Sequence, residues 1–299
     1  MKAFYTDHFV LPLPSGHRFP MEKYSRLHDL VSELPEVELL EAPSATDTQI
    51  LYAHDPGYLI KVLQGNLNHA EQREIGFPWS EKMVERSRRS SGATIAAAKM
   101  ALKDGISANL AGGTHHAYRD RGSGFCVFND SVIAARALQK EINFKLQIAV
   151  IDLDVHQGNG TASILKNDSS IFTLSIHGQN NFPFTKEQSD LDIDLPDGCD
   201  DETYLHALED SLEKIDTRFS VDFIIYLAGA DPHEDDRLGR LNLSKNGLQK
   251  RDEIVFQYAK EHQIPLALSM AGGYGKNIES TVDIHFQTIK SALKFQMQY

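Results

Sequence analysis

Short apolar runs alternate with longer stretches of helical periodicity along most of the chain. Four nearly continuous apolar runs predict buried strands, because strands of a parallel sheet covered on both faces do not alternate with polar residues. These runs are Ile148 to Leu153, Ile171 to Ile176, Phe223 to Ala228 and Pro265 to Met270. Apolar residues at helical spacing predict helices over Glu81 to Lys103, Asp130 to Lys140, Glu202 to Ile215, Ser244 to His262 and Val282 to Phe295.

This alternation predicts an α/β fold with a doubly wound, mostly parallel β-sheet flanked by helices. No repeat, low-complexity segment or linker divides the chain, so residues 1–299 are expected to form a single domain. Leu11 to Pro20 and Gly178 to Gly198 are rich in Pro, Gly, Asn and Asp and are expected to be long surface loops. Ligands bind outside the carboxyl ends of the strands in such sheets, so the polar residues there are of most interest.

The composition is that of a soluble globular protein, with 41% hydrophobic and 24% charged residues. A formal net charge of −12 disfavours direct binding to nucleic acid or an anionic membrane, whereas a Lys-rich partner would be attracted.

Cys126 and Cys199 match no metal-ligand spacing and are expected to be free thiols. With neither a signal peptide nor an apolar run of the ~20 residues that a membrane helix needs, the chain is expected to be cytoplasmic. Its oligomeric state is not indicated.

The strongest chemical feature is the segment Ile151 to Gly160, which begins at the end of a predicted strand and reads Ile-Asp-Leu-Asp-Val-His-Gln-Gly-Asn-Gly. Strand alternation would place Asp152, Asp154 and His156 on one side of the chain. Carboxylate and imidazole ligands together suit zinc, so Asp154 and His156 are predicted metal ligands with Asp152 behind them. The alternative is that these acids only cap a turn.

Asp231 leaves another predicted strand at the same sheet edge and is the predicted third ligand. A catalytic zinc ion typically has three protein ligands and one open position, which agrees with this count. The acids that follow, from Glu234 to Asp236, are expected to lie in a solvated loop, and His233 is expected to lie on the rim of the site.

Two further motifs supply groups that amide hydrolysis requires. His115 and His116 follow Gly112-Gly113-Thr114, and adjacent imidazoles could divide the work of a base and an acid. Tyr274 follows a glycine pair after the last predicted strand, and its phenol could stabilise an oxyanion. Each motif alone is equally compatible with loop packing.

Taken together and in this order, the motifs resemble those of the histone deacetylase family, within the arginase/deacetylase superfamily. The resemblance extends from Gly16 to Tyr274, and the region from Arg18 to Lys23 is most similar to bacterial proteins close to class IV deacetylases. It implies a zinc-dependent amidohydrolase that removes an acyl group from the ε-amine of lysine or from a related amine. The implied zinc ligands are Asp154, His156 and Asp231, and the implied catalytic residues are His115 backed by Asp152, His116 backed by Asn159, and Tyr274.

The resemblance also implies how a substrate is held. Phe125, after Gly124, and Phe182 would form opposite walls of an acyl-lysine tunnel, with Gly273 beside it. An acid that grips the substrate backbone at the rim is Asp55, unless Pro56 occupies that position. A potassium ion near the zinc would be bound by Asp152, Asp154, His156, Ser175 and Ile176.

The sequence leaves the acylated substrate open between a protein lysine, a polyamine and a small metabolite. Leu238 stands where polyamine-specific relatives carry an acid, so acetyl-polyamines are expected to be poor substrates. Gly112, Gly113 and Thr114 are small residues beside the histidine pair and predict room for acyl groups longer than acetyl. Two other functions are alternatives. One is a binuclear manganese ureohydrolase, which needs a further acid where this chain has His233, and the other is an inactive acyl-lysine binding module.

Overall fold

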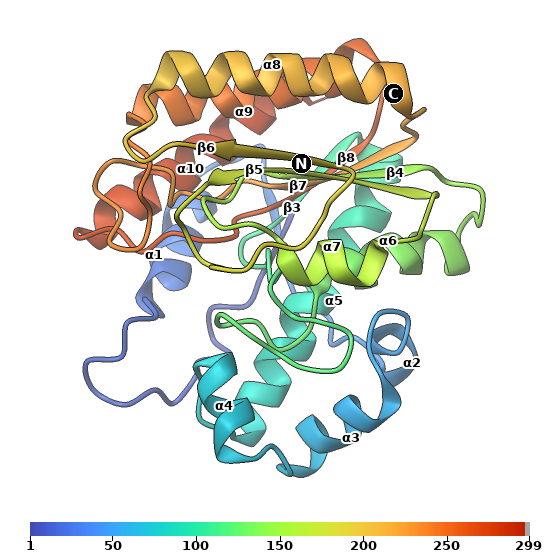
Figure 1. Cartoon of the computed structure of the whole chain (residues 1–299), viewed down its shortest axis with the longest axis vertical. Coiled ribbons are helices and arrows are strands. Elements are labelled where there is room, and N and C mark those ends of the chain that lie inside the picture. Colours follow the sequence, from blue (N-terminus) through green and yellow to red (C-terminus); the bar gives the residue numbers. More distant parts are fainter. Residues whose placement is uncertain (297–299) are drawn as a thin grey trace.

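The computed structural model describes residues 1–296 and contains one parallel β-sheet (Figure 1). Its strands are β1 (Lys2–Tyr5), β2 (Glu38–Glu41), β3 (Ile106–Asn109), β4 (Ile148–Asp152), β5 (Ile171–Gly178), β6 (Leu191–Leu195), β7 (Phe223–Leu227) and β8 (Leu266–Ser269). Their order across the sheet is β2-β1-β3-β8-β7-β4-β5-β6, and every neighbouring pair is parallel. The predicted α/β fold with a mostly parallel sheet is confirmed.

Helices cover both faces of this sheet, as a doubly wound fold requires (Figure 1). They are α1 (Glu22–Ser32), α2 (Asp47–Ile50), α3 (Pro56–Gln64), α4 (His69–Ile75), α5 (Glu81–Asp104), α6 (Asp130–Glu141), α7 (Asn159–Leu165), α8 (Asp201–Arg218), α9 (Lys245–Glu261) and α10 (Ile278–Phe295). Helices α1, α10, α9 and α8 pack in sequence on one face, and α5, α6 and α7 cover the other. None of these helices has the length and apolar character that crossing a membrane would need.

The buried strands explain why their sequences are apolar without alternation. In β7, the side chains of Ile224 and Tyr226 enter one hydrophobic core, and those of Phe223, Ile225 and Leu227 enter the core on the opposite face. Each fully buried large apolar side chain contributes about 1.5–3 kcal/mol, so both faces stabilise the strand.

The predicted strands and helices are all present, with ends that differ by a few residues. The expectation of a loop over Gly178 to Gly198 was wrong in part, because Leu191–Leu195 forms the edge strand β6. This strand reads Leu-Asp-Ile-Asp-Leu and is only partly buried, as expected at a sheet edge. The four-residue strands β1, β2 and β3 were not predicted. The segment Leu11 to Pro20 contains no helix or strand, as expected.

The sheet order brings the predicted chemical motifs together. Strands β3, β8, β7 and β4 are neighbours at the centre of the sheet. The chain reaches His115 after β3, Tyr274 after β8, Asp231 after β7 and Asp154 after β4. Because all four strands are parallel, these residues leave the sheet at the same edge.

Candidate active site

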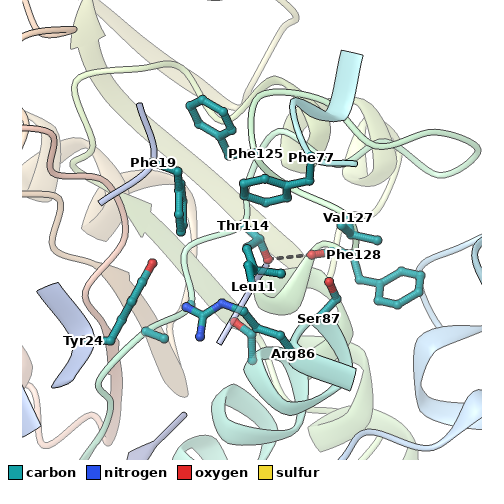
Figure 2. A pocket seen from close by; sticks show the side chains of 13 residues that line it. Leu11, Phe19, Tyr24, Phe77, Arg86, Ser87, Thr114, Phe125, Val127 and Phe128 are labelled. Carbon is teal, nitrogen blue, oxygen red and sulfur yellow. Dashed lines mark hydrogen bonds between the residues drawn. The ribbon is translucent and has the colours of Figure 1, made fainter. Parts of the chain in front are cut away.

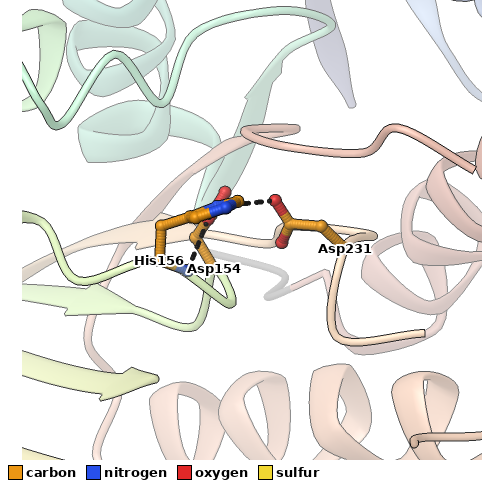
Figure 3. A group of neighbouring side chains, drawn as sticks. All are labelled: Asp154, His156 and Asp231. Atoms are coloured by element: carbon orange, nitrogen blue, oxygen red, sulfur yellow. Dashed lines mark hydrogen bonds and ion pairs between the residues drawn. The ribbon is translucent and has the colours of Figure 1, made fainter. Parts of the chain in front are cut away.

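Asp154, His156 and Asp231 converge beyond the ends of β4 and β7 (Figure 3). One nitrogen or oxygen atom from each side chain lies within 4.8 Å of the others, and all three residues are buried. The Nδ1 atom of His156 lies 2.9 Å from Asp154 Oδ1 and 3.3 Å from Asp231 Oδ2.

The backbone around these side chains fixes their carboxylates. Asp154 accepts hydrogen bonds from the N–H groups of His156 (3.0 Å) and Gly272 (2.7 Å), and Asp231 accepts one from Val155 (2.9 Å). A Cβ atom at Gly272 would lie 1.9 Å from Asp231 Oδ2, so only glycine allows the last loop to approach the two acids.

The predicted strand geometry of this motif needs one correction. β4 ends at Asp152, so Asp154 and His156 lie in the following loop rather than alternating along a strand. The N–H of Asp154 donates to the Asp152 carboxylate (3.2 Å) and the N–H of His156 to the Asp154 carboxylate. These side-chain hydrogen bonds replace the strand pairing.

Two carboxylates this close in a buried site repel each other and favour a bound cation. Burial and the negative charge of Asp154 raise the pKa of Asp231 to about 7. Burial alone would lower the pKa of His156, but the carboxylates of Asp154 and Asp231 raise it to about 10. Asp231 Oδ2 is buried and accepts no hydrogen bond within residues 1–296. Two carboxylate oxygens and one imidazole nitrogen are a ligand set that zinc accepts, so these residues fit a zinc ion.

The two adjacent histidines lie directly beside this group. His115 Nδ1 lies 2.6 Å from the Asp152 carboxylate, and His116 Nδ1 lies 2.7 Å from the side-chain oxygen of Asn159. Their Nε2 atoms are 3.2 Å apart, and that of His115 is 3.8 Å from Asp154 Oδ1. Each imidazole is therefore held by one polar partner behind it, while its other nitrogen faces the site.

The partners behind the histidines give the two rings different acidities. Burial alone would lower the pKa of His115, but the carboxylates of Asp152 and Asp154 raise it to about 9. The pKa of His116 is held well below its ordinary value by burial and by the positive charge of the neighbouring imidazoles. The neutral amide of Asn159 offsets this only in part. The His115 ring therefore favours the protonated form, and the His116 ring favours the neutral form.

Tyr274 enters the site from the loop after β8. Its ring centroid lies 5.9 Å from that of Phe125 and 6.4 Å from that of Phe19. Burial raises the pKa of the phenol well above its ordinary value, and so does the negative charge of Asp154. The hydroxyl is therefore kept as a hydrogen-bond donor.

The two phenylalanines of the predicted tunnel have different surroundings. Phe182 packs edge-on against His116, with ring centroids 4.9 Å apart. Gly124 lies between them, because a Cβ atom there would be 2.5 Å from the His116 ring and 3.1 Å from Phe182. Phe125 lies 5.4 Å from Phe77, centroid to centroid. The backbone carbonyl of Leu238 accepts a hydrogen bond of 2.7 Å from Asn181, so Leu238 is beside the Phe182 loop.

The other predicted residues have the following surroundings. Asp55 caps α3, with its carboxylate accepting a hydrogen bond of 2.7 Å from the N–H of Gly57. The register of β4 and β5 pairs Asp152 with Ser175, and Ile176 follows in the core. The backbone carbonyl of Gly273 lies 3.5 Å from Lys23 Nζ.

The acids after Asp231 contain a residue that the sequence did not single out. Glu234 and Asp235 are exposed as expected, but Asp236 is buried and accepts hydrogen bonds from the N–H groups of Tyr274 (2.6 Å) and Leu238 (2.8 Å). The expectation of a wholly solvated loop was therefore wrong. The sequence signal for the buried Asp236 was Gly239, three residues later, because this spacing is typical of a turn that an Asp side chain stabilises.

His233 also differs from the sequence-based expectation. Its side chain is buried rather than exposed on a rim, and burial lowers its pKa. It is not part of the metal-ligand group.

Two more buried charged residues hold the site loops and were missed. Asp130 accepts hydrogen bonds from the N–H groups of Gly113 (3.0 Å) and Thr114 (2.7 Å), just before the histidine pair. Arg251 is fully buried and donates to the carbonyls of Leu153 (3.2 Å) and Gly229 (2.6 Å), which precede two proposed ligands. Nothing in the sequence distinguishes these residues from surface charges.

A cavity that opens in part to solvent lies beside the loop that leads to the histidine pair (Figure 2). Phe19 and Phe125, which pack near Tyr274, form part of its wall. Gly112 and Thr114 line it, whereas Gly113 packs against Ala271 instead.

Comparisons with known proteins place the chain in a family. A model of the histone deacetylase domain matches residues 17–289. The chain is 42% identical over 284 residues to an uncharacterized protein of Picosynechococcus sp., covering 94% of each chain. It is 32% identical over 274 residues to histone deacetylase 2 of Arabidopsis thaliana, covering 87% of this chain and 70% of the relative. An HDAC homolog from Aquifex aeolicus has the same fold, with a TM-score of 0.84 at 25% identity over 97% of this chain and 83% of that chain. The chain belongs to the histone deacetylase family.

Proposed function

We propose that this protein is a zinc-dependent deacylase that hydrolyses the amide of an acylated lysine, and that the whole chain is one catalytic domain. Family membership supports deacetylase activity in general. The observation that carries the zinc dependence is the buried group of Asp154, His156 and Asp231, with the paired imidazoles beside it. Asp231 Oδ2 is buried, has no hydrogen bond in the described chain and has only the ion contact of 3.3 Å to His156 Nδ1, so a bound metal ion would stabilise it.

Asp154, His156 and Asp231 would hold a zinc ion, which would supply Lewis-acid chemistry to the scissile carbonyl and to the attacking water. His116, whose pKa is lowered, is the base that takes the proton from this water. His115, protonated and backed by Asp152, adds positive charge beside the reacting carbonyl. Tyr274 donates a hydrogen bond to the carbonyl oxygen as it gains negative charge. His116 then passes the proton to the departing amine.

The side chains around the site suit a long, thin substrate. Phe125 and Phe182 are proposed to flank the lysine methylenes, with Gly124 and Gly273 allowing close backbone approach. Asp55 is proposed as the acid at the rim. We also retain the potassium site at Asp152, Asp154, His156, Ser175 and Ile176 as a proposal, supported by the adjacency of Asp152 and Ser175 in the sheet.

The cavity beside the histidine loop favours acyl groups longer than acetyl. Gly112 and Thr114 line it, and its phenylalanine walls are apolar. Each methylene buried there would contribute about 0.8 kcal/mol to binding. A small acylated amine is the second candidate substrate class, but Leu238 offers no carboxylate to a distant ammonium group.

The two other functions have less support. A binuclear ureohydrolase needs two sets of ligands, and the described residues contain a single group of this kind. An inactive binding module would be expected to lack a ligand, a histidine or the tyrosine, and this chain has all of them.

The test is a panel of acyl-lysine peptides and acetyl-polyamines on the purified enzyme with and without a chelator. We expect chelator-sensitive turnover, faster on acyl-lysine peptides than on acetylspermidine. Turnover that survives complete zinc removal would contradict the zinc mechanism, and faster turnover of acetylspermidine would contradict the substrate class.

A further inference from the structure

Two buried cations lie beside the cavity, and neither forms an ion pair with a carboxylate within residues 1–296. Arg86, on α5, is 6% exposed, and Lys23, on α1, is 2% exposed. Their hydrogen bonds go to backbone carbonyls instead. Burying an ion without a counter-ion is unfavourable, so an anion near these two side chains would be bound strongly.

Arg86 is the cation that lines the cavity (Figure 2). Its Nη1 donates to the carbonyls of Thr6 and Phe9, each at 3.3 Å, and its guanidinium carbon lies 4.3 Å from the centre of the Tyr24 ring. Its Nε and Nη2 atoms donate no hydrogen bond within the described residues, and both keep some solvent-accessible surface. These two atoms form the edge of a guanidinium that binds a carboxylate through parallel hydrogen bonds.

Lys23 extends the positive charge from Arg86 toward the catalytic site. Its Nζ lies 5.2 Å from the centre of the Tyr24 ring and 5.6 Å from that of Tyr274. It donates to the carbonyls of Ala271 (3.1 Å) and Gly273 (3.5 Å), in the loop that carries Tyr274. Lys23 therefore carries positive charge between the ring of Tyr274 and the ring of Tyr24, on which Arg86 also lies.

Much of the remaining wall is apolar, although Ser87, Ser90 and Thr114 add hydroxyl groups to it. Phe19, Phe77 and Phe128 line the same cavity as Arg86. A ligand that matches both features has methylene groups followed by a terminal carboxylate.

We propose that this cavity is a subsite for the terminal carboxylate of a dicarboxylic acyl group, such as succinyl or glutaryl, carried on lysine. The proposal rests on the deacylase function given above and narrows its substrate class. Hydrolysis adds water across the amide: the acyl carbon gains the oxygen, the lysine nitrogen gains a proton, and a dicarboxylate and a free amine leave. No further reactant is needed.

The experiment compares two peptides that differ only in charge at the end of the acyl chain. In 4-methylpentanoyl-lysine, an isopropyl group replaces the terminal carboxylate of succinyl-lysine at nearly the same shape. The measured quantity is the ratio of kcat/KM for succinyl-lysine to kcat/KM for 4-methylpentanoyl-lysine. It is measured in the wild type, in Arg86→Met and in Arg89→Met.

Arg89 is the matched control on the same helix. It stacks on Phe9 at 4.4 Å and donates to the Ala42 carbonyl (2.8 Å), but it pairs with Glu41 and Glu85 and does not line the cavity. Because charged hydrogen bonds are lost, we expect Arg86→Met to lower the ratio about tenfold or more, and Arg89→Met to leave it within about twofold. An unchanged ratio in Arg86→Met would overturn the proposal. If Arg86→Met does not fold, a wild-type ratio below about one tenth overturns it, and a ratio above one supports it.

A second measurement distinguishes two ligands for the subsite: the terminal carboxylate of an acyl-lysine substrate, and the carboxylate product that hydrolysis releases. Succinate and acetate are tested as inhibitors of acetyl-lysine hydrolysis by the wild type and Arg86→Met. Weaker inhibition by both in the variant, with no turnover of succinyl-lysine, would assign the subsite to the carboxylate product and overturn the dicarboxylic substrate. If the wild type hydrolyses no acyl-lysine, the proposed function fails. Stabilisation of the folded protein by glutarate, dependent on Arg86, would then still support the carboxylate subsite.

Discussion

Replacing Asn159 by Asp should move the acid side of the pH–rate profile to higher pH. The side-chain oxygen of Asn159 lies 2.7 Å from His116 Nδ1, and its amide nitrogen donates to the Tyr118 hydroxyl at 2.9 Å. Aspartate has the same shape, and the Tyr118 hydroxyl can turn to donate to it. The substitution therefore adds a negative charge behind the base with little change in packing.

The size of the effect follows from Coulomb's law. Two unit charges about 4 Å apart interact by about 4 kcal/mol at the effective dielectric constant near 20 that suits proteins. Desolvation of the new carboxylate offsets part of this, so we expect the pKa of His116 to rise by about 1–3 units. A bound metal ion lowers this pKa in both proteins alike, so the difference between them is retained.

The sign follows from the role of His116. A base works in its neutral form, so activity falls as the pH drops through its pKa. Raising this pKa moves the loss of activity to higher pH. The assay is kcat/KM on an acetyl-lysine peptide from pH 5 to 9, with Asn159→Gln as a control that keeps the amide but displaces it. An acid side that stays in place in an active Asn159→Asp enzyme would show that His116 is not the base.

Three further predictions concern other parts of the site. Tyr274→Phe should lower kcat by about 10²–10³ with unchanged zinc content, and a loss of only a few-fold would remove the phenol from the mechanism. Arg251→Met leaves the Asp252 carboxylate buried without its counter-ion, held only by the hydroxyls of Tyr226 and Thr288. It should lower the free energy of unfolding by about 3–5 kcal/mol in denaturant titrations, whereas a change below about 1 kcal/mol would mean that the pair is not buried in solution. Thr114→Trp should fill the cavity and shorten the preferred acyl chain, with Thr114→Val as the control for the lost hydroxyl hydrogen bonds to Phe128 and Asp130; an unchanged ranking of acyl chains would contradict this.

The central strands and the chemical motifs were predictable because both have strong local signals. Strands such as Phe223–Leu227 are buried on both faces and read as continuous apolar runs. Parallel strands deliver the residues after them to one edge, so the grouping of Asp154 with Asp231 followed from the fold class. The short strands β1, β2 and β3 gave no such signal, because four residues do not establish a period.

The supporting residues could not be found in the same way. Asp130 and Arg251 are charged, and a charged residue in a sequence indicates a surface position unless its partners are known. Their partners include backbone groups distant in the chain, such as the Gly229 carbonyl for Arg251. The burial of Arg86 depends likewise on an N-terminal loop that reaches across α5.

The zinc stoichiometry of activity tests the central claim most directly. The enzyme would be stripped with a chelator, titrated with zinc or manganese, and assayed on an acetyl-lysine peptide, with Asp231→Ala alongside. We predict that activity rises with zinc to a plateau at one ion per chain, and that Asp231→Ala neither retains zinc nor regains activity. A plateau at two manganese ions per chain, full activity of the stripped enzyme, or stoichiometric zinc in Asp231→Ala would contradict the account.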